Sequence, residues 1–325
     1  MLLNVIFAIV GAALVLIGAD KLTDGSVALA RRFAIPELVI GLTVVAFGTS
    51  LPEFVVSFFA SLNGAAAMSI GNIIGSNLFN TLMIVGCTAL VCPINVSRST
   101  IYKDIPFSLL ASIVLIALAL DTIFGSGTNV LDRGDGIALL GFFAVFMAYT
   151  FAMATSSSSS STDKAMEETD TAAAPQIAGW RIALYILIGL VGLIGGGELF
   201  VNGASGIARS LGVSEAMIGL TLVAGGTSLP ELATSIMAAR KGQSGIAVGN
   251  VIGSNLFNIF WILGACSCIN PLPVQGIEWT DFSMLLLSGL MFWFFARTKH
   301  RIFRWEGAVM VAVYFAYIAF LVRGI

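Results

Sequence analysis

Charged residues are scarce in this chain. Only 10% of its 325 residues are Asp, Glu, Lys or Arg, whereas 58% are hydrophobic and the mean hydropathy is +0.97. A soluble domain carries about a quarter charged residues, so this composition excludes a soluble globular protein. Several apolar runs are long enough to span a bilayer as helices, and their lack of polar alternation excludes a β-barrel. The sequence therefore predicts an all-α polytopic membrane protein.

Residues that commonly carry catalysis or bind transition metals are also few. The one histidine, His300, lies between Lys299 and Arg301, and the four cysteines show no paired metal spacing. No HExxH or GxSxG motif occurs, and no histidine lies near Ser50 or Ser228 in the sequence to act as their base. We therefore expect no enzyme activity, no cofactor, no nucleic-acid partner and no obligate protein partner.

The apolar runs divide the chain into two halves. Hydropathy predicts ten membrane spans, at 2–19, 36–61, 67–91, 105–121, 135–153, 180–202, 215–238, 245–268, 279–297 and 305–323. Residues 1–154 and 179–325 then hold five spans each. Between them, residues 155–178 contain the serine run Ser156–Ser161 and several acidic residues. This segment is too polar to bury a core, so we expect a disordered loop.

The basic residues predict how the chain is oriented in the membrane. With ten spans, thirteen lysines and arginines lie in loops opposite the N-terminus, and three, Arg133, Arg209 and Arg323, lie on the N-terminal side. Basic residues favour the cytoplasmic side. We therefore expect a protein of the cell (inner) membrane with both termini outside and residues 155–178 in the cytoplasm.

One six-residue motif occurs twice in the chain. Gly48–Glu53 and Gly226–Glu231 both read Gly-Thr-Ser-Leu-Pro-Glu, at an offset of 178 residues. At this offset 41–86 aligns with 219–264 without a gap, and about half of the positions are identical. Because each half has an odd number of spans, the second half must enter the membrane upside down. Such inverted repeats are typical of secondary transporters, whose substrate site lies near the membrane midplane.

The repeated motif places oxygen-bearing groups inside apolar spans. Pro52 and Pro230 have no backbone N–H, so we expect the carbonyls of Gly48 and Gly226 to lose their helical partners. Helical spacing puts Ala46, Thr49 or Ser50, Glu53 and Ser57 on one face. The next span adds a second polar stripe, Asn72, Ser76 and Asn80, repeated as Asn250, Ser254 and Asn258. Asn77 and Asn255 lie off this stripe, and we expect them to form hydrogen bonds between helices.

These residues together predict an all-oxygen cation site with two carboxylates. Ca²⁺ prefers about six to eight oxygen ligands, including carboxylates, and hydroxyls and carbonyls also suit Na⁺. Protons should compete as well, because a carboxylate in the membrane is costly unless a cation neutralises it. The leading hypothesis is antiport of Ca²⁺ against Na⁺. Exchange of Ca²⁺ for H⁺ uses the same carboxylates and remains an alternative, and a passive cation channel is a further one.

The paired motifs resemble the α-repeats of the cation/Ca²⁺ exchanger superfamily, and each is followed by Gly-Asn-x-Ile-Gly-Ser-Asn-Leu-Phe-Asn. The likeness is greatest to prokaryotic Na⁺/Ca²⁺ antiporters. It implies ten helices, an external N-terminus, alternating access and a central diamond of cation sites. The polar loop at 155–178 lies outside the resemblance.

The resemblance also implies roles for particular residues. Glu53 and Glu231 would be the main Ca²⁺ ligands, and Thr49 and Thr227 would add coordinating oxygens. The Na⁺ sites would be completed by the carbonyls of Ala46 and Ala224 and the hydroxyls of Ser50, Ser76, Ser228 and Ser254. Some members have Asp where this chain has Asn258, so with Asn80 both central amides are neutral here. This difference argues against K⁺ co-transport.

Overall fold

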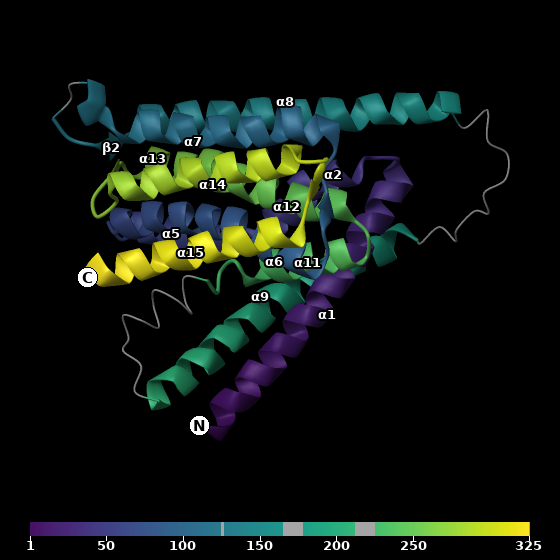
Figure 1. Cartoon of the computed structure of the whole chain (residues 1–325), viewed down its shortest axis with the longest axis horizontal. Coiled ribbons are helices and arrows are strands. Elements are labelled where there is room, and N and C mark those ends of the chain that lie inside the picture. Colours follow the sequence, from purple (N-terminus) through teal and green to yellow (C-terminus); the bar gives the residue numbers. More distant parts are fainter. Residues whose placement is uncertain (125–126, 165–177, 212–224, 325) are drawn as a thin grey trace.

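The chain is almost entirely helical in the computed structural model, which describes residues 1–124, 127–164, 178–211 and 225–324 (Figure 1). The elements of the first half are α1 (Leu2–Phe33), α2 (Glu37–Ile40), η1 (Gly41–Val45), α3 (Ala46–Thr49), α4 (Leu51–Leu62), α5 (Ala66–Leu78), η2 (Phe79–Ile84), α6 (Val85–Val91), β1 (Ile94–Asn95), η3 (Thr100–Asp104), α7 (Ile105–Ala119), η4 (Asp121–Phe124), β2 (Val130–Leu131) and α8 (Arg133–Lys164). Those of the second half are α9 (Gly179–Ser210), α11 (Leu229–Arg240), α12 (Ser244–Leu256), η6 (Phe257–Leu263), α13 (Gly264–Ile269), β3 (Leu272–Pro273), α14 (Trp279–Arg297), β4 (Arg301–Ile302) and α15 (Arg304–Gly324).

The helical membrane architecture predicted from hydropathy is confirmed. Among the described residues, eight helices are long and apolar enough to cross a membrane. A ninth span is present if Glu37–Thr49 and Leu51–Leu62, which are bent by 49° relative to each other, count as one. Residues 215–224 of the span expected at 215–238 lie outside the described residues, 225–228 form a turn, and α11 covers the rest. The count of ten therefore stays a prediction.

The expectation of a disordered loop at 155–178 was wrong for the first part of this segment. Helix α8 continues through the serine run to Lys164, whereas residues 165–177 lie outside the described ranges. Nucleation is the costly step of helix formation, so an existing helix extends readily through serines, whose helix propensity is only modestly below that of alanine. The polar composition ends the apolar span at Thr155 but does not end the helix.

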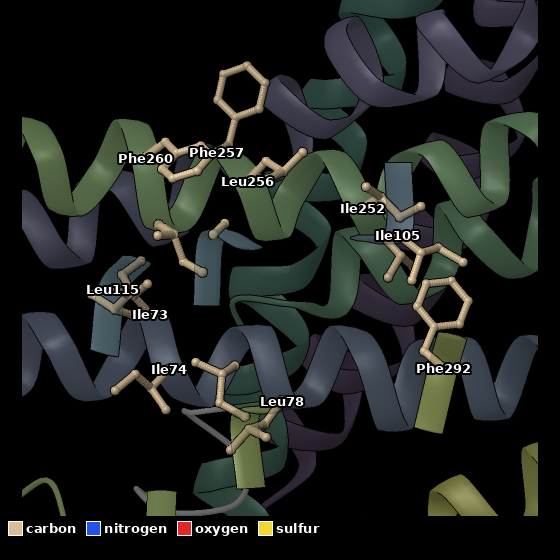
Figure 2. Packing of buried hydrophobic residues seen from close by; sticks show 14 of the residues in the cluster. Ile73, Ile74, Leu78, Ile105, Leu115, Ile252, Leu256, Phe257, Phe260 and Phe292 are labelled. Atoms are coloured by element: carbon tan, nitrogen blue, oxygen red, sulfur yellow. The ribbon is translucent and has the colours of Figure 1, made fainter. Parts of the chain in front are cut away.

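Two spans form the centre of the molecule. The apolar window of Ala66–Val91 is 78% buried and that of Ser244–Ile269 is 94% buried, whereas the other long spans reach at most 39%. Apolar side chains of these spans pack against each other and against α7 and α14, as Figure 2 shows for Ile73, Ile74, Leu78, Ile252, Leu256, Ile105, Leu115 and Phe292. The second span of each sequence repeat is thus fixed inside the hydrophobic core.

Two short strand pairs join the two halves of the chain. Strand β1 pairs antiparallel with β4, and β2 pairs antiparallel with β3. Each pair combines one strand from the first half with one from the second. The halves are therefore linked at their loops as well as through the buried helices.

Helices α1 and α9 form a tightly packed pair that lies obliquely to the other long helices (Figure 1). Glycines make the close approach possible. A Cβ added to Gly11 would lie 2.4 Å from the backbone N of Phe200, and one added to Gly189 would lie 2.6 Å from the backbone N of Leu22. Small residues of this kind let membrane helices pack backbone to backbone.

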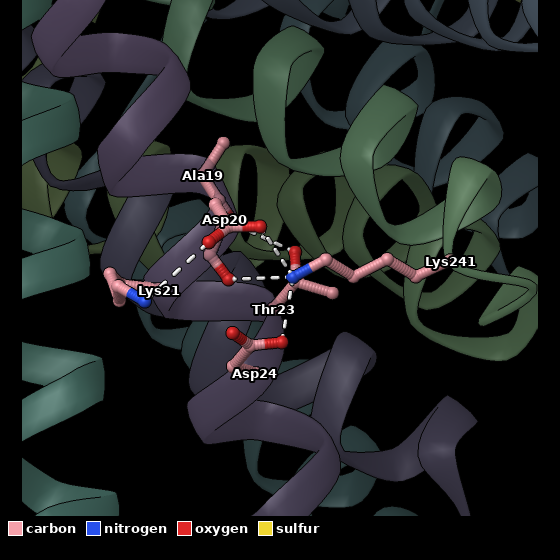
Figure 3. Close-up of polar contacts among 6 residues, drawn as sticks. All are labelled: Ala19, Asp20, Lys21, Thr23, Asp24 and Lys241. Atoms are coloured by element: carbon pink, nitrogen blue, oxygen red, sulfur yellow. Dashed lines mark hydrogen bonds and ion pairs between the residues drawn. The ribbon is translucent and has the colours of Figure 1, made fainter.

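An ion-pair cluster ties this helix pair to the end of α11. The Nζ atom of Lys241 lies 2.7 Å from Asp20 Oδ1 and 2.6 Å from Asp24 Oδ1, and it donates to the Asp20 carbonyl at 3.1 Å (Figure 3). Partial burial alone would lower the pKa of Lys241, but the hydrogen bonds and charges of the two aspartates raise it overall. The lysine therefore stays protonated, and it fixes α1 against the helix that begins near Glu231.

Neutralising Lys241 is expected to destabilise the protein modestly. The partners are partly exposed, with 28% to 41% of their side-chain surface accessible, so solvent screens the cluster. Lys241→Gln should therefore lower the free energy of unfolding by about 1 kcal/mol or less, and high salt should shrink the difference. Arg240→Gln is the matched control, because exposed Arg240 forms no ion pair within the described part of the chain. Equal thermal shifts for the two variants would contradict this role of Lys241.

Candidate cation site

The first copy of the repeated motif stands at a break between two helical segments, and the second copy leads directly into a helix. Ser50, with φ −84° and ψ 7°, separates α3 from α4, and Ser228, with φ −90° and ψ 8°, precedes α11. The prolines Pro52 and Pro230 occupy the first turn of the following helix, where a missing N–H costs little. Glu53 and Glu231 therefore lie in the first turns of α4 and α11.

The carbonyl freed by Pro230 accepts a hydrogen bond from another donor. The Gly226 carbonyl accepts a hydrogen bond from the backbone N–H of Leu229 at 3.3 Å. The last turn before the break tightens to a three-residue step, which gives this carbonyl a new partner in place of the missing proline N–H. Gly226 therefore does not supply an unpaired backbone oxygen.

A serine hydroxyl of each half donates a hydrogen bond to the glutamate carboxylate of the other half. Ser50 Oγ donates to Glu231 Oε1 at 3.0 Å, and Ser228 Oγ donates to Glu53 Oε1 at 2.9 Å. Both glutamates are only 1% exposed, and each lies three residues along the chain from the serine that contacts the other. The structure thus brings four of the predicted site residues together in one buried centre.

Two asparagines brace the glutamate-bearing helices. Asn72 Nδ2 donates to the Glu53 carbonyl at 3.3 Å and to Ser57 Oγ at 2.9 Å. Its mate Asn250 repeats both bonds, with the Glu231 carbonyl at 3.2 Å and Ser235 Oγ at 3.0 Å.

Thr49 adds a bond across the halves, because its Oγ1 donates to Asn250 Oδ1 at 3.1 Å. Ser235 had not been singled out as a site residue, although the offset of 178 maps it onto Ser57. The repeat offset is therefore the sequence signal that identifies it.

The second polar stripe is anchored by amides from the opposite half. Asn80 Nδ2 donates to Asn255 Oδ1 at 3.2 Å, and Asn258 Nδ2 donates to Asn77 Oδ1 at 3.0 Å. Asn80 and Asn258 lie at the start of the π-helical segments η2 and η6. Single turns of π-helix are frequent at functional sites, because they redirect side chains within a helix. The hydrogen bonds between helices expected for Asn77 and Asn255 are confirmed.

Several buried side-chain oxygens have no hydrogen-bond partner within the described residues. Six of them form three mate pairs across the repeat: Glu53 Oε2 with Glu231 Oε2, Ser76 Oγ with Ser254 Oγ, and Asn80 Oδ1 with Asn258 Oδ1. Leaving a buried polar atom unsatisfied is costly, so such groups in a native structure point to a ligand, an ion or water. All six atoms belong to residues that the sequence had placed in the cation site.

Other predicted site residues stand as follows. The Ala46 carbonyl accepts the Ser50 N–H at 3.0 Å and lies 3.4 Å from Thr49 Oγ1. Thr227 lies in the turn before α11, directly ahead of Ser228. Ala224 lies outside the described residues. The ligand roles of Ala46, Thr227 and Ala224 therefore stay predictions.

The electrostatics of the centre favour a bound cation. Within the described ranges, neither Glu53 nor Glu231 forms a salt bridge, and both carboxyl groups are almost fully buried. An ionised carboxylate taken out of water without a partner costs several kcal/mol. A cation held between the two glutamates would remove this cost, and the surrounding hydroxyl and amide oxygens are ligands that hard cations prefer.

Comparison with known proteins gives matches along nearly the whole chain. The family model described as "Sodium/calcium exchanger protein" matches residues 3–152 and 181–323. Inner membrane protein YrbG of Escherichia coli (strain K12) is 38% identical over 294 residues, which cover 90% of this chain and 88% of that protein. Sodium/calcium exchanger MaX1 of Methanosarcina acetivorans is 30% identical over 350 residues, with 98% of each chain covered.

A solved structure resembles the fold described above. The sodium-calcium exchanger NCX_Mj, in crystals soaked with Na⁺ and Ca²⁺, superposes with a TM-score of 0.82 at 34% identity, and the match covers 98% of each chain. The family resemblance expected from the repeated motifs is thereby confirmed. The chain belongs to the sodium/calcium exchanger protein family of membrane transporters.

Proposed function

We propose that this chain is a secondary antiporter that exchanges Ca²⁺ for Na⁺ across the cell membrane by alternating access. The six buried, unpartnered oxygens of Glu53, Glu231, Ser76, Ser254, Asn80 and Asn258 carry this proposal. Their number and chemistry fit Ca²⁺, which takes about six to eight oxygen ligands. Family membership and the likeness to NCX_Mj support the same pair of ions.

The charges in the site explain why two different cations would compete for it. Glu53 and Glu231 together offer two negative charges, which one Ca²⁺ would neutralise. Na⁺ would use the same carboxylates with the hydroxyls of Thr49, Thr227, Ser50 and Ser228 and the carbonyls of Ala46 and Ala224. In this structure the hydroxyl groups of Ser50 and Ser228 donate their hydrogens to the carboxylates. The lone pairs of each hydroxyl oxygen would therefore face a bound ion. Shared ligands make binding of the two ions mutually exclusive, as antiport requires.

The proposal includes ten membrane helices arranged as two inverted five-helix repeats, over 1–154 and 179–325. The exchanged Ser50–Glu231 and Ser228–Glu53 contacts support a two-fold relation between the repeats. We further propose that both termini lie outside and that 155–178 lies on the cytoplasmic side. An inverted repeat allows the same site to face either side of the membrane in turn.

Flux measurements on purified protein in proteoliposomes test this function. Vesicles loaded with Na⁺ and diluted into Na⁺-free medium should accumulate ⁴⁵Ca²⁺, and collapse of the Na⁺ gradient should abolish the uptake. Uptake driven by a pH gradient and indifferent to Na⁺ would assign H⁺ coupling instead. Calcium flux that needs no counter-ion would assign a channel. An imposed potential would reveal net charge movement, since each charge crossing 100 mV is worth about 2.3 kcal/mol.

A further inference from the structure

The amide NH₂ groups of Asn80 and Asn258 are hydrogen-bonded to two other asparagines. The Oδ1 atoms of the two central side chains are buried and have no partner within the described residues. The NH₂ groups of these side chains donate to the Oδ1 atoms of Asn255 and Asn77 at 3.2 Å and 3.0 Å. Each central amide is thus held by a residue from the opposite half of the chain.

The direction of these amides matters because oxygen and nitrogen have opposite effects on a cation. An asparagine amide rotated by half a turn has nearly the same shape, but it presents two N–H donors where the oxygen had been. An oxygen attracts a cation, whereas an NH₂ group repels it. A central amide free to rotate would therefore lose part of its value as a ligand.

The supporting asparagines are themselves prevented from rotating. Asn77 Nδ2 donates to the backbone carbonyl of Asn255 at 3.4 Å, and Asn255 Nδ2 donates to Thr81 Oγ1 at 2.9 Å. Rotation of either amide would break these bonds and turn an N–H towards the NH₂ group of a central asparagine. All four asparagines are at most 6% exposed, so little water is available to replace a lost bond.

We propose that Asn77 and Asn255 are positioning residues that orient the oxygens of Asn258 and Asn80 towards the transported cation. This inference rests on the proposed function, because it assigns a role at the same site. Asn77 and Asn255 touch no ion in this scheme and act only through the amides that they hold. The competing explanation is that they merely join α5 to α12.

A double-mutant cycle separates these two roles. An aspartate at position 258 has two equivalent oxygens, so its direction needs no control. Asn77→Leu should raise the apparent KM for Ca²⁺ by about tenfold in the native background, the effect of losing one hydrogen-bonding oxygen to a charged group. In the Asn258→Asp background the same change should raise the KM by less than about twofold, since the carboxylate cannot be misoriented.

The measurement is Na⁺-driven ⁴⁵Ca²⁺ uptake, with KM and Vmax determined for the native chain, both single variants and the double variant. Ser288→Ala is the matched control, because Ser288 lines the same small cavity as Asn77 but donates only to Leu285 on its own helix. It should leave KM unchanged. If Asn77→Leu prevents folding, the mirror cycle of Asn255→Leu with Asn80→Asp makes the same comparison, and Asn77→Asp keeps the acceptor for the Asn258 amide.

The possible outcomes are distinct. Equal losses from Asn77→Leu in both backgrounds would show a purely structural role and overturn the proposal, as would an unchanged KM in the native background. If the native chain itself shows no Na⁺-dependent Ca²⁺ uptake, the proposed function fails before the variants are compared. A KM effect confined to the native background supports the positioning role.

Discussion

Glu53→Gln and Glu231→Gln are each expected to reduce Ca²⁺ transport by about 100-fold or more, because removing one partner from a buried charge pair costs about 3 to 5 kcal/mol. Glutamine has nearly the same shape and can still accept the hydrogen bond from Ser228 or Ser50. The substitution therefore removes the charge and leaves the local geometry almost intact. The rate of Na⁺-driven ⁴⁵Ca²⁺ uptake in proteoliposomes measures the loss.

The same variants should fold at least as well as the native chain when no cation is present. Each removes a buried carboxylate that has no salt-bridge partner within the described residues, and an uncompensated buried charge is destabilising. Ca²⁺ should raise the melting temperature of the native chain by mass action and should not raise that of either variant. Asp132→Asn is the matched control, since this exposed carboxylate accepts a hydrogen bond from the Asp135 N–H at the start of α8 and belongs to none of the contacts described for the site. Near-normal exchange in either variant would contradict the assignment of that glutamate to the site.

Gly253→Ala is expected to destabilise the protein and displace one side of the cation site. A Cβ at this position would lie 2.6 Å from Ala46 Cβ and 2.7 Å from the Leu42 carbonyl oxygen, so α12 and the η1–α3 segment must move apart. Overpacking of this kind typically costs about 1 to 3 kcal/mol. The displaced segment carries Thr49 and leads into Ser50, and α12 carries Ser254, so exchange should fall together with stability.

Thermal unfolding in detergent and vesicle uptake measure the two effects of Gly253→Ala. Gly141→Ala is the matched control, because it makes the same substitution at an exposed position of α8 where an added Cβ meets no atom of the described chain within 4 Å. This change should leave exchange intact. Equal behaviour of the two variants would show that close packing of α12 on η1 is not needed.

The main features of the fold and the site could be predicted because they repeat. A carboxylate, two hydroxyls and a proline are improbable inside an apolar span, and their recurrence at Glu53 and Glu231 at a fixed offset identified the centre. Four-residue spacing likewise indicated that Ser76 and Asn80 share a face, and one side-chain oxygen of each is buried without a partner within the described residues.

Other features depend on contacts that spacing does not encode. Asn77 lies off the polar stripe, yet its carboxamide oxygen accepts the amide of Asn258 from the opposite half. Its role depends on how α5 and α12 pack, which no local pattern specifies. The Gly226 carbonyl gains Leu229 as a donor because the turn tightens before the proline, and α8 passes through the serine run because an existing helix extends at little cost. These are local energetic choices that composition alone does not determine.

Competition between Ca²⁺ and Na⁺ for one site is tested most directly by equilibrium binding to the purified protein. Calcium binding would be titrated calorimetrically at a series of Na⁺ concentrations, with choline chloride holding the ionic strength constant. We predict that the apparent Kd for Ca²⁺ rises steadily with Na⁺ while the number of sites stays the same, and that Glu231→Gln abolishes the binding. Calcium binding unaffected by Na⁺, or retained in Glu231→Gln, would contradict a shared site built on the two glutamates.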